Sequence, residues 1–212
     1  MKIVRSLLKK IIRFFYYERV VLYGYDLTKQ HKYESKTGMK LCNASMEDID
    51  LLFHDKMNTD ITTIKYDLWK EKISNGSWKG YLIKNGQEIV AQAFYSIEDI
   101  FFGGTKWVEL TLPEGSAYGF KLFARPDYRG KGLGQAITSF RLNSAKNQGV
   151  KKFYTIILSH NKVSRHNEEK IGGYYIGSVL FIKCRYFNWV LLSPGIIIEG
   201  LKKKQISVFK SN

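Results

Sequence analysis

Residues 122–135 constrain the fold more than any other part of the chain, because they join a strand pattern to a helix pattern through three glycines in five residues. The apolar and aromatic run over residues 117–124 predicts a strand that Pro126 ends. Residues 134–147 have the spacing of a helix, and Gly149 stands where a left-handed C-cap is expected. A strand, a glycine turn and a helix in this order predict a sheet flanked by helices.

The glycine-rich turn itself has the chemistry of an anion site. Glycine allows the backbone to approach a ligand closely, and the N–H groups at the start of the following helix carry a partial positive charge that suits a diphosphate. Arg129 and Lys131 add two full charges. A Walker A loop is excluded because Lys131 is followed by Gly132 instead of Ser or Thr, and a dinucleotide GxGxxG fails at Gln135. A different phosphorylated ligand is therefore expected.

The other patterns predict a mixed α/β sheet. Strands are expected over residues 19–27, 39–42, 78–84, 88–95 and 152–159, with further strand material over 174–192. Asn85 and Gly86 predict a tight hairpin. Helices are expected over residues 46–57, with Ser45 as the N-cap, and over 61–73 and 162–170. Residues 96–116 remain ambiguous, because apolar stretches alternate with Gly103 and Gly104.

The two ends of the chain differ from its centre. Residues 1–16 form a basic amphipathic pattern, and Lys9, Lys10 and Arg13 interrupt the apolar run that a secretory signal would need. The expected organisation is an N-terminal segment of residues 1–38 with a helix, a strand and a connector, a main domain over 39–192, and a basic extension over 193–212. The formal net charge of +15 predicts an attraction for anions. Cys42 and Cys184 form neither a disulfide framework nor a zinc motif, which favours the cytoplasm.

The central motif resembles the signature of the GNAT acetyltransferase superfamily, in which Arg or Gln is followed after two residues by Gly, and after one more by Gly or Ala. Arg129, Gly132 and Gly134 match it. The resemblance implies a mainly antiparallel central sheet whose splayed central strands bind acyl-CoA. By position it assigns pantetheine contacts to the backbone of Leu122, Phe123 and Ala124. In the same way it assigns contacts with the pyrophosphate to Arg129, Gly130, Lys131, Gly132, Leu133, Gly134 and Gln135.

Residues 161–174 resemble a second piece of the family, an Asn-rich turn with a short helix and a closing Lys-x-Gly-aromatic segment. This resemblance gives Asn161 a contact with the cofactor arm, although Asn161 also suits a helix cap. The family's proton-donating tyrosine aligns with Glu168, for which a solvated helix face is the structural alternative. Glu168, Glu109, His160 and Glu98 are the candidates for the acid and base. His160 also suits a strand end.

The resemblance implies an acyl-CoA-dependent N-acyltransferase that uses acetyl-CoA, or another short acyl-CoA, and no metal. The acceptor is expected to be a primary amine on a small molecule, a sugar, a peptide or a lipid-linked precursor. A non-catalytic acyl-CoA-binding domain of the same fold is the first alternative, since a fold alone does not establish turnover. A basic nucleic-acid-binding protein is the second, without a recognisable binding motif. Residues 1–16 are expected either to lie on an anionic membrane surface, at the inner face of the membrane, or to dock on a partner or on the domain itself.

Overall fold

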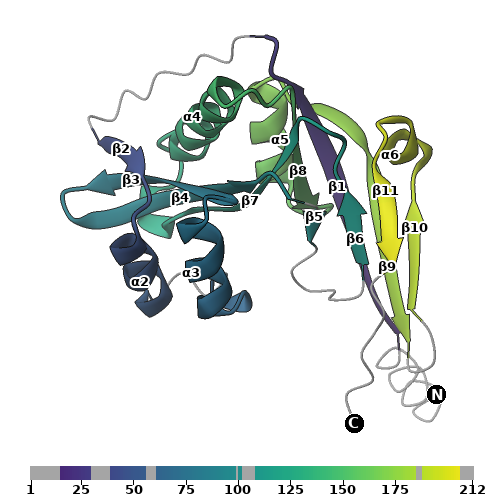
Figure 1. The fold of residues 1–212 in the computed structure, drawn as a ribbon, viewed down its shortest axis with the longest axis horizontal. Helices are drawn as coiled ribbons and strands as arrows, with labels where there is room; N and C mark the ends of the chain where they lie inside the picture. Colours follow the sequence, from purple (N-terminus) through teal and green to yellow (C-terminus); the bar gives the residue numbers. More distant parts are fainter. Residues whose placement is uncertain are drawn as a thin grey trace, which may run out of the picture.

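The computed structural model describes residues 15–29, 39–55, 61–98, 100–101, 108–184 and 188–205. An eight-stranded sheet runs through the molecule in the order β10-β9-β1-β8-β7-β4-β3-β2 (Figure 1). Its strands are β1 (Phe15–Asp26), β2 (Lys40–Asn43), β3 (Trp78–Asn85), β4 (Glu88–Ser96), β7 (Ser116–Ala124), β8 (Lys152–Leu158), β9 (Tyr174–Cys184) and β10 (Asn188–Leu192). Among the strand pairs of the described residues, β7 and β8 are parallel and the others antiparallel. The mixed α/β sheet that the sequence patterns predict is confirmed, and so is the mainly antiparallel order that the resemblance implies.

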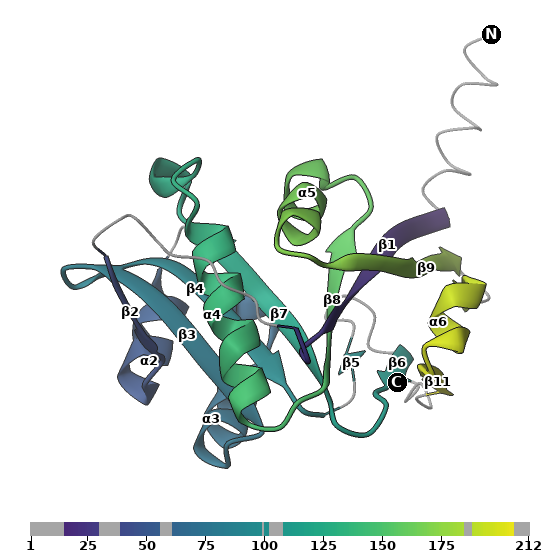
Figure 2. The same ribbon diagram turned by 90° about the horizontal axis from the view of Figure 1, so that it is seen from above.

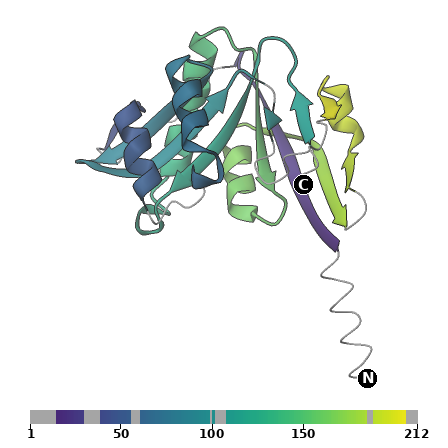
Figure 3. The same ribbon diagram turned by 60° about the horizontal axis from the view of Figure 1, so that its bottom comes forward.

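Helices cover both faces of this sheet, and a second sheet of three strands lies at one end. The helices are α2 (Met46–His54), α3 (Tyr66–Ser74), α4 (Leu133–Asn147), α5 (Lys162–Lys170) and α6 (Pro194–Ile198), with short 3-10 turns η1 (Ile61–Thr63) and η2 (Pro126–Tyr128). The small sheet contains β5 (Ile100–Phe101), β6 (Val108–Thr111) and β11 (Lys202–Gln205). Figure 3 shows the small sheet and α6 beside the β1, β9 and β10 end of the large sheet.

Two apolar layers hold the β2-β3-β4-β7 half of the sheet between helices. Ile137 and Leu142 of α4 pack on one face, against Tyr81 and Tyr95. Trp69 of α3 is fully buried on the opposite face, in a cluster that includes residues of α2. Figure 1 shows α4 on one side of these strands and both α2 and α3 on the other. Apolar burial on both faces is the main source of stability for such a layered sheet.

Several local predictions are confirmed by backbone geometry. Ser45 caps α2 with a reciprocal capping box to Asp48. Gly86 turns the β3-β4 hairpin with a φ of 61°, and Gly149 follows α4 with a φ of 83°. Glycine adopts these left-handed angles without the steric cost that a Cβ brings. The signals that identified these elements are local, which is why the sequence alone predicts them well.

Other element boundaries require correction. The single helix expected over residues 61–73 is divided into η1 and α3, because Lys65 adopts an extended conformation with a ψ of 138°. Helix α2 ends at His54 instead of residue 57, since Asp55 is also extended. Phe15 and Tyr16 belong to strand β1 and not to the expected N-terminal helix. The rest of that helix, residues 1–14, lies outside the described residues, as do 206–212 of the expected extension.

Strand β1 lies inside the large sheet, between β8 and β9. It pairs with β8 from Val20–Leu158 to Asp26–Lys152, and with β9 from Phe15–Cys184 to Gly24–Tyr174. The N-terminal segment expected over residues 1–38 thus contributes a central strand to the sheet of the segment expected over 39–192. The division into an N-terminal segment and a following domain stays a prediction. In the structure, strands from both segments belong to one sheet.

Candidate cofactor and active site

The parallel strands β7 and β8 separate part of the way along their length. Their pairing runs from Ser116–Lys152 to Gly119–Thr155 and ends there, whereas β7 continues to Ala124 and β8 to Leu158. The expected splay of the two central strands is therefore present. Beyond Gly119 the edge of β7 that faces β8 is available to another extended chain, because backbone N–H and C=O groups at a strand edge can form a ladder.

A β-bulge in β7 coincides with the splay. On its other edge, β7 pairs with β4 at Phe94–Phe120 and at Gln92–Phe123, so two residues of β7 oppose one of β4. Lys121 occupies the bulge with a φ of 52°, a left-handed conformation that is uncommon outside glycine. Bulges bend a strand and increase its twist. The bulge thus accounts for the direction in which the end of β7 leaves β8 while keeping its bonds to β4.

The glycine-rich turn leads from β7 through η2 into the N-terminus of α4. Gly130 and Gly132 have φ angles of 77° and 75°, which favour glycine at both positions. Gly132 is the N-cap of α4, without a side-chain cap, and its carbonyl accepts the N–H of Ala136 at 3.0 Å. The first N–H groups of the helix, at residues 133–135, have no intrahelical acceptor in such a geometry. Together with the helix dipole they form a backbone site for a phosphate group.

Two cationic side chains flank this turn. Arg129 is exposed and donates from Nε to the carbonyl oxygen of Ala124 at 3.3 Å. Lys131 is also exposed, with its Nζ 4.7 Å from the centre of the Tyr128 ring. Tyr128 in turn donates a hydrogen bond of 2.8 Å to Glu88 Oε2. The two charges are thereby held next to β7 and η2, where they favour an anion at the helix start.

Helix α5 meets the start of α4 on the same side of the sheet. Gln135 Nε2 donates to Asn167 Oδ1 at 3.1 Å, and a Cβ at Gly134 would lie 4.0 Å from Asn167 Nδ2. Asn161 caps α5 by accepting the N–H of Ser164 on Oδ1 at 3.1 Å. The capping role considered for Asn161 is confirmed, and its exposed position is compatible with a ligand contact as well.

Glu168 points into the interior of the domain. It is 3% exposed, and the hydroxyl of Tyr25 in β1 donates a hydrogen bond to its Oε2. The solvated helix face considered for Glu168 is therefore wrong. Burial raises the pKa of the Glu168 carboxyl, although the nearby Arg141 and the Tyr25 hydrogen bond act in the opposite direction. A carboxyl in this environment can hold a proton, but it lies beneath the surface of the site.

Arg141 of α4 completes this buried polar group. Its side chain is 1% exposed, donates from Nη1 to the carbonyl oxygen of Phe94 at 3.1 Å, and lies 5.1 Å from the centre of the Phe153 ring. Gly119 provides the space, since a Cβ there would lie 2.8 Å from Arg141 Cζ. The guanidinium thus sits at the last paired residue of β7, where the two strands separate.

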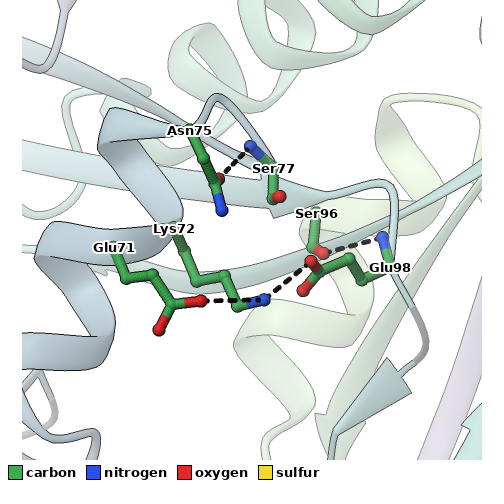
Figure 4. A network of polar contacts seen from close by, with 6 residues as sticks. All are labelled: Glu71, Lys72, Asn75, Ser77, Ser96 and Glu98. Carbon is green, nitrogen blue, oxygen red and sulfur yellow. Dashed lines mark hydrogen bonds and ion pairs between the residues drawn. The ribbon is translucent and has the colours of Figure 1, made fainter.

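The remaining acid and base candidates are dispersed over the fold. His160 is exposed in the turn between β8 and α5. Glu109 lies in β6 of the small sheet. Glu98 follows β4 and forms an ion pair of 2.8 Å with Lys72 of α3, while its N–H donates to Ser96 Oγ (Figure 4). The hydrogen bond that the Lys72 ammonium donates to Glu98 raises the pKa of Lys72 and keeps it cationic. The structure does not bring Glu109 onto the sheet that carries the splay.

Replacing Glu168 with Gln is expected to remove a pH dependence of stability. Because the pKa of Glu168 is raised in the folded state, the folded protein binds this proton more tightly than the unfolded chain. Its free energy of unfolding should then fall as pH rises from about 4.5 through the raised pKa, and an amide cannot contribute to that fall. Urea denaturation between about pH 5 and 9 measures the slope.

Glu169→Gln is the matched control, since Glu169 is the neighbouring carboxylate, is exposed, and accepts the Tyr23 hydroxyl at 2.6 Å. This variant removes one carboxyl charge from the same helix and leaves the buried Glu168 in place. Equal slopes in the wild type and Glu168→Gln would contradict the assigned direction of the pKa shift.

Within the described ranges, no group of three or more His, Cys, Asp and Glu residues could hold a metal ion. In the same ranges, no helix has the length and apolar character needed to cross a membrane.

Comparisons with known proteins agree with this geometry. A sequence model described as the acetyltransferase (GNAT) family matches residues 44–173, which is more than half of the chain. No curated protein matches the chain. A solved Drosophila protein is similar in fold, with a TM-score of 0.56 and 14% identity, over 84% of this chain and 56% of that one. A GCN5-related N-acetyltransferase from Kribbella flavida gives a TM-score of 0.55 and 13% identity, over 92% of this chain and 66% of its own.

An aminoglycoside acetyltransferase from an uncultured soil metagenomic sample gives a TM-score of 0.50 and 8% identity, over 66% of this chain and 90% of that chain. The chain thus spans about half to two thirds of the length of the Drosophila and Kribbella proteins. At these identities the solved structures establish the fold alone. The family model adds the sequence evidence, since its match contains the bulged strand, the glycine turn and the capped helix α5. With its splayed parallel strands and the helix start that follows them, this chain belongs to the GNAT acetyltransferase family.

Proposed function

We propose that the protein is an acyl-CoA-dependent N-acyltransferase that transfers an acyl group, most simply acetyl, to a primary amine. The observation that carries the proposal is the end of the β7-β8 pairing at Gly119–Thr155, followed by a glycine-capped helix. An extended ligand arm with a diphosphate fits this combination. The backbone of β7 beyond Gly119 can bond the arm, and the start of α4 can bond the phosphates.

The residues present fit acetyl-CoA at this position. The N–H groups of residues 133–135, with Arg129 and Lys131 beside them, would hold the pyrophosphate. The backbone of Leu122, Phe123 and Ala124 would hold the pantetheine arm, although the Ala124 carbonyl already accepts a hydrogen bond from Arg129. Acetyl-CoA, when bound, supplies the acyl thioester. Backbone donors on the splayed edge of β7 would polarise its carbonyl.

The proposed transfer forms a C–N bond between the acceptor amine and the acyl carbon and breaks the C–S bond. The amine loses a proton to a base, and the departing sulfur takes one up, so the products are an amide and free coenzyme A. Glu98 and His160 are the proposed candidates for these proton transfers. Both side chains reach solvent, because both are at least partly exposed. Buried Glu168 is assigned no contact with the acceptor.

A panel of amines assayed with acetyl-CoA tests the proposal through the release of free thiol. Amino sugars belong in the panel because one protein of similar fold is an aminoglycoside acetyltransferase, and small amines, peptide amines and lipid-linked amines complete it. Thiol release that depends on one class of amine is the expected result. Tight acetyl-CoA binding without thiol release for any amine would contradict catalysis while leaving the cofactor site intact.

A non-catalytic acyl-CoA-binding domain is the second candidate, and one observation favours it. The residue at the position of the family's proton-donating tyrosine is Glu168, which is buried and bonded to Tyr25. The amine panel separates the two candidates directly. A cytoplasmic location stays a prediction, consistent with the free thiol of Cys42.

A further inference from the structure

Buried polar side chains lie next to the point where β7 and β8 separate. The last residues that the two strands pair are Gly119 and Thr155, and we call this pair the vertex of the splay. A Cβ at Gly119 would lie 2.8 Å from Cζ of Arg141. The Thr155 hydroxyl is near enough to the Glu168 carboxyl to lower its pKa. Each strand thus meets one buried ionisable side chain at the vertex.

These side chains join three elements around the splay. Arg141 belongs to α4, Glu168 to α5 and Tyr25 to β1, and we call the three residues the vertex group. Figure 2 shows α4 over β4 and β7, with α5 next to it on the side of β8 and β9. The Tyr25 hydroxyl donates to Glu168 Oε2 and lies 3.4 Å from the main-chain oxygen of the same residue. Gly173 permits this approach, since a Cβ there would lie 2.9 Å from both that oxygen and the Tyr25 ring.

The reacting end of the proposed cofactor is expected at the same vertex. Phosphates bound at the start of α4 lie near the end of β7 at Ala124, because residues 125–132 connect that end to the helix. An arm that pairs with the β7 backbone must then run back along the strand toward Gly119. The acyl thioester is at the far end of this arm. It therefore falls where the strands meet, next to the vertex group.

Stability alone does not explain charged side chains at this position. Arg141 is 1% exposed and Glu168 is 3% exposed. In the part of the chain that the structure describes, Nε of Arg141 has no hydrogen-bond partner. Burying charges and an unsatisfied donor is unfavourable, and apolar residues of similar volume often replace a buried ion pair without loss of stability. Directional bonds do, however, fix the packed elements in one arrangement more closely than apolar contacts can.

We propose that Arg141 and Glu168 are positioning residues that fix the separation of β7 and β8 at the vertex and thereby the fit of the acyl-CoA arm. Arg141 holds the β7 side, because it packs on Gly119 and donates to the Phe94 carbonyl oxygen in the neighbouring β4. Glu168 holds the β8 side at Thr155. Both act from beneath the strands, without contact with the acceptor amine. Since the arm is that of acyl-CoA, this role rests on the proposed function.

The double substitution Arg141→Met with Glu168→Gln tests this proposal. It removes both charges together, so no buried charge is left without its partner, and the free energy of unfolding in urea should stay close to that of the wild type. The affinity for acetyl-CoA in calorimetric titration should still fall roughly tenfold or more, because a displacement of about 1 Å in a binding site is enough for such a loss. If the double variant does not fold, as judged by circular dichroism, Glu168→Gln alone carries the test.

Asp48→Asn is the matched control, because Asp48 is another buried carboxyl, 5% exposed, and forms an ion pair of 2.5 Å with Lys84 at the β2-β3 end of the sheet. It should lower stability and leave the affinity for acetyl-CoA unchanged. Wild-type affinity in the folded double variant would overturn the positioning role and leave the proposed function intact. An equal loss of affinity in Asp48→Asn would also overturn it, since affinity would then follow stability. A wild type that binds no acetyl-CoA would overturn the proposed function and this role with it.

Discussion

Deleting residues 1–26 should abolish folding, whereas deleting residues 1–14 should leave the domain folded. The longer deletion removes β1 from between β8 and β9. Five of its side chains, at positions 20, 21, 22, 23 and 25, are buried. At about 1.5–3 kcal/mol for each buried apolar side chain, their loss amounts to on the order of 10 kcal/mol. A domain is stable by only about 5–15 kcal/mol in total, so the remaining chain cannot compensate.

Soluble yield and thermal unfolding followed by circular dichroism measure this difference. The shorter deletion is the control, because it removes all five cations of the first seventeen residues but no residue of a described strand. A cooperative transition at the wild-type temperature in the longer deletion would show that β1 is dispensable. The result also matters for choosing a fragment to express. The family match begins at residue 44, and a fragment that starts there would lack β1.

Replacing Gly132 with Val should reduce the affinity for acetyl-CoA by at least roughly a hundredfold. The backbone at Gly132 has a φ of 75°, which a β-branched residue cannot adopt without strain. The turn must therefore move, and the N–H groups at the start of α4 move with it. Each charge-assisted hydrogen bond to a phosphate contributes about 1.5–3 kcal/mol, so losing two or more gives this factor. Arg129→Ala should have a milder effect, because it removes one exposed contact.

Gly149→Val is the matched control for this prediction. Gly149 follows the other end of α4 with a φ of 83°, so the substitution introduces the same kind of backbone strain in the same helix. Both variants should lose stability, and only Gly132→Val should lose affinity in calorimetric titration with acetyl-CoA. Wild-type affinity in folded Gly132→Val would mean that the turn has no part in cofactor binding, and the proposed function would fail with it.

The sequence predicts those parts of the site in which all the residues lie close together in one short segment of the chain. The glycine turn, its two cations and the cap of α5 at Asn161 are contiguous patterns, and the structure places them as expected. The splay itself follows from the family resemblance. The bulge at Lys121 carries no local signal, because a lysine with a φ of 52° is held there by the register between β4 and β7.

The buried group of Tyr25, Arg141 and Glu168 could not be assembled from sequence, because its members come from three distant elements. One sign was available: Arg141 is spaced four residues from Ile137 and from Ala145, on the apolar side of α4. A cation in such a position must find buried partners. The position of β1 in the sheet could not be predicted either, because its sequence indicates a strand but does not identify the two strands with which it pairs.

The central position of β1 also determines when the domain can form during synthesis. Its partners extend to Leu158 in β8 and to Cys184 in β9, so its pairs span most of the length of the chain. Strand β1 is made before both of its partners and must wait, unpaired, until β8 and β9 have been made. Contacts of such long sequence separation slow folding, and an apolar strand that waits exposed is prone to aggregation. Refolding should therefore depend strongly on protein concentration and benefit from a chaperone that holds the first strand.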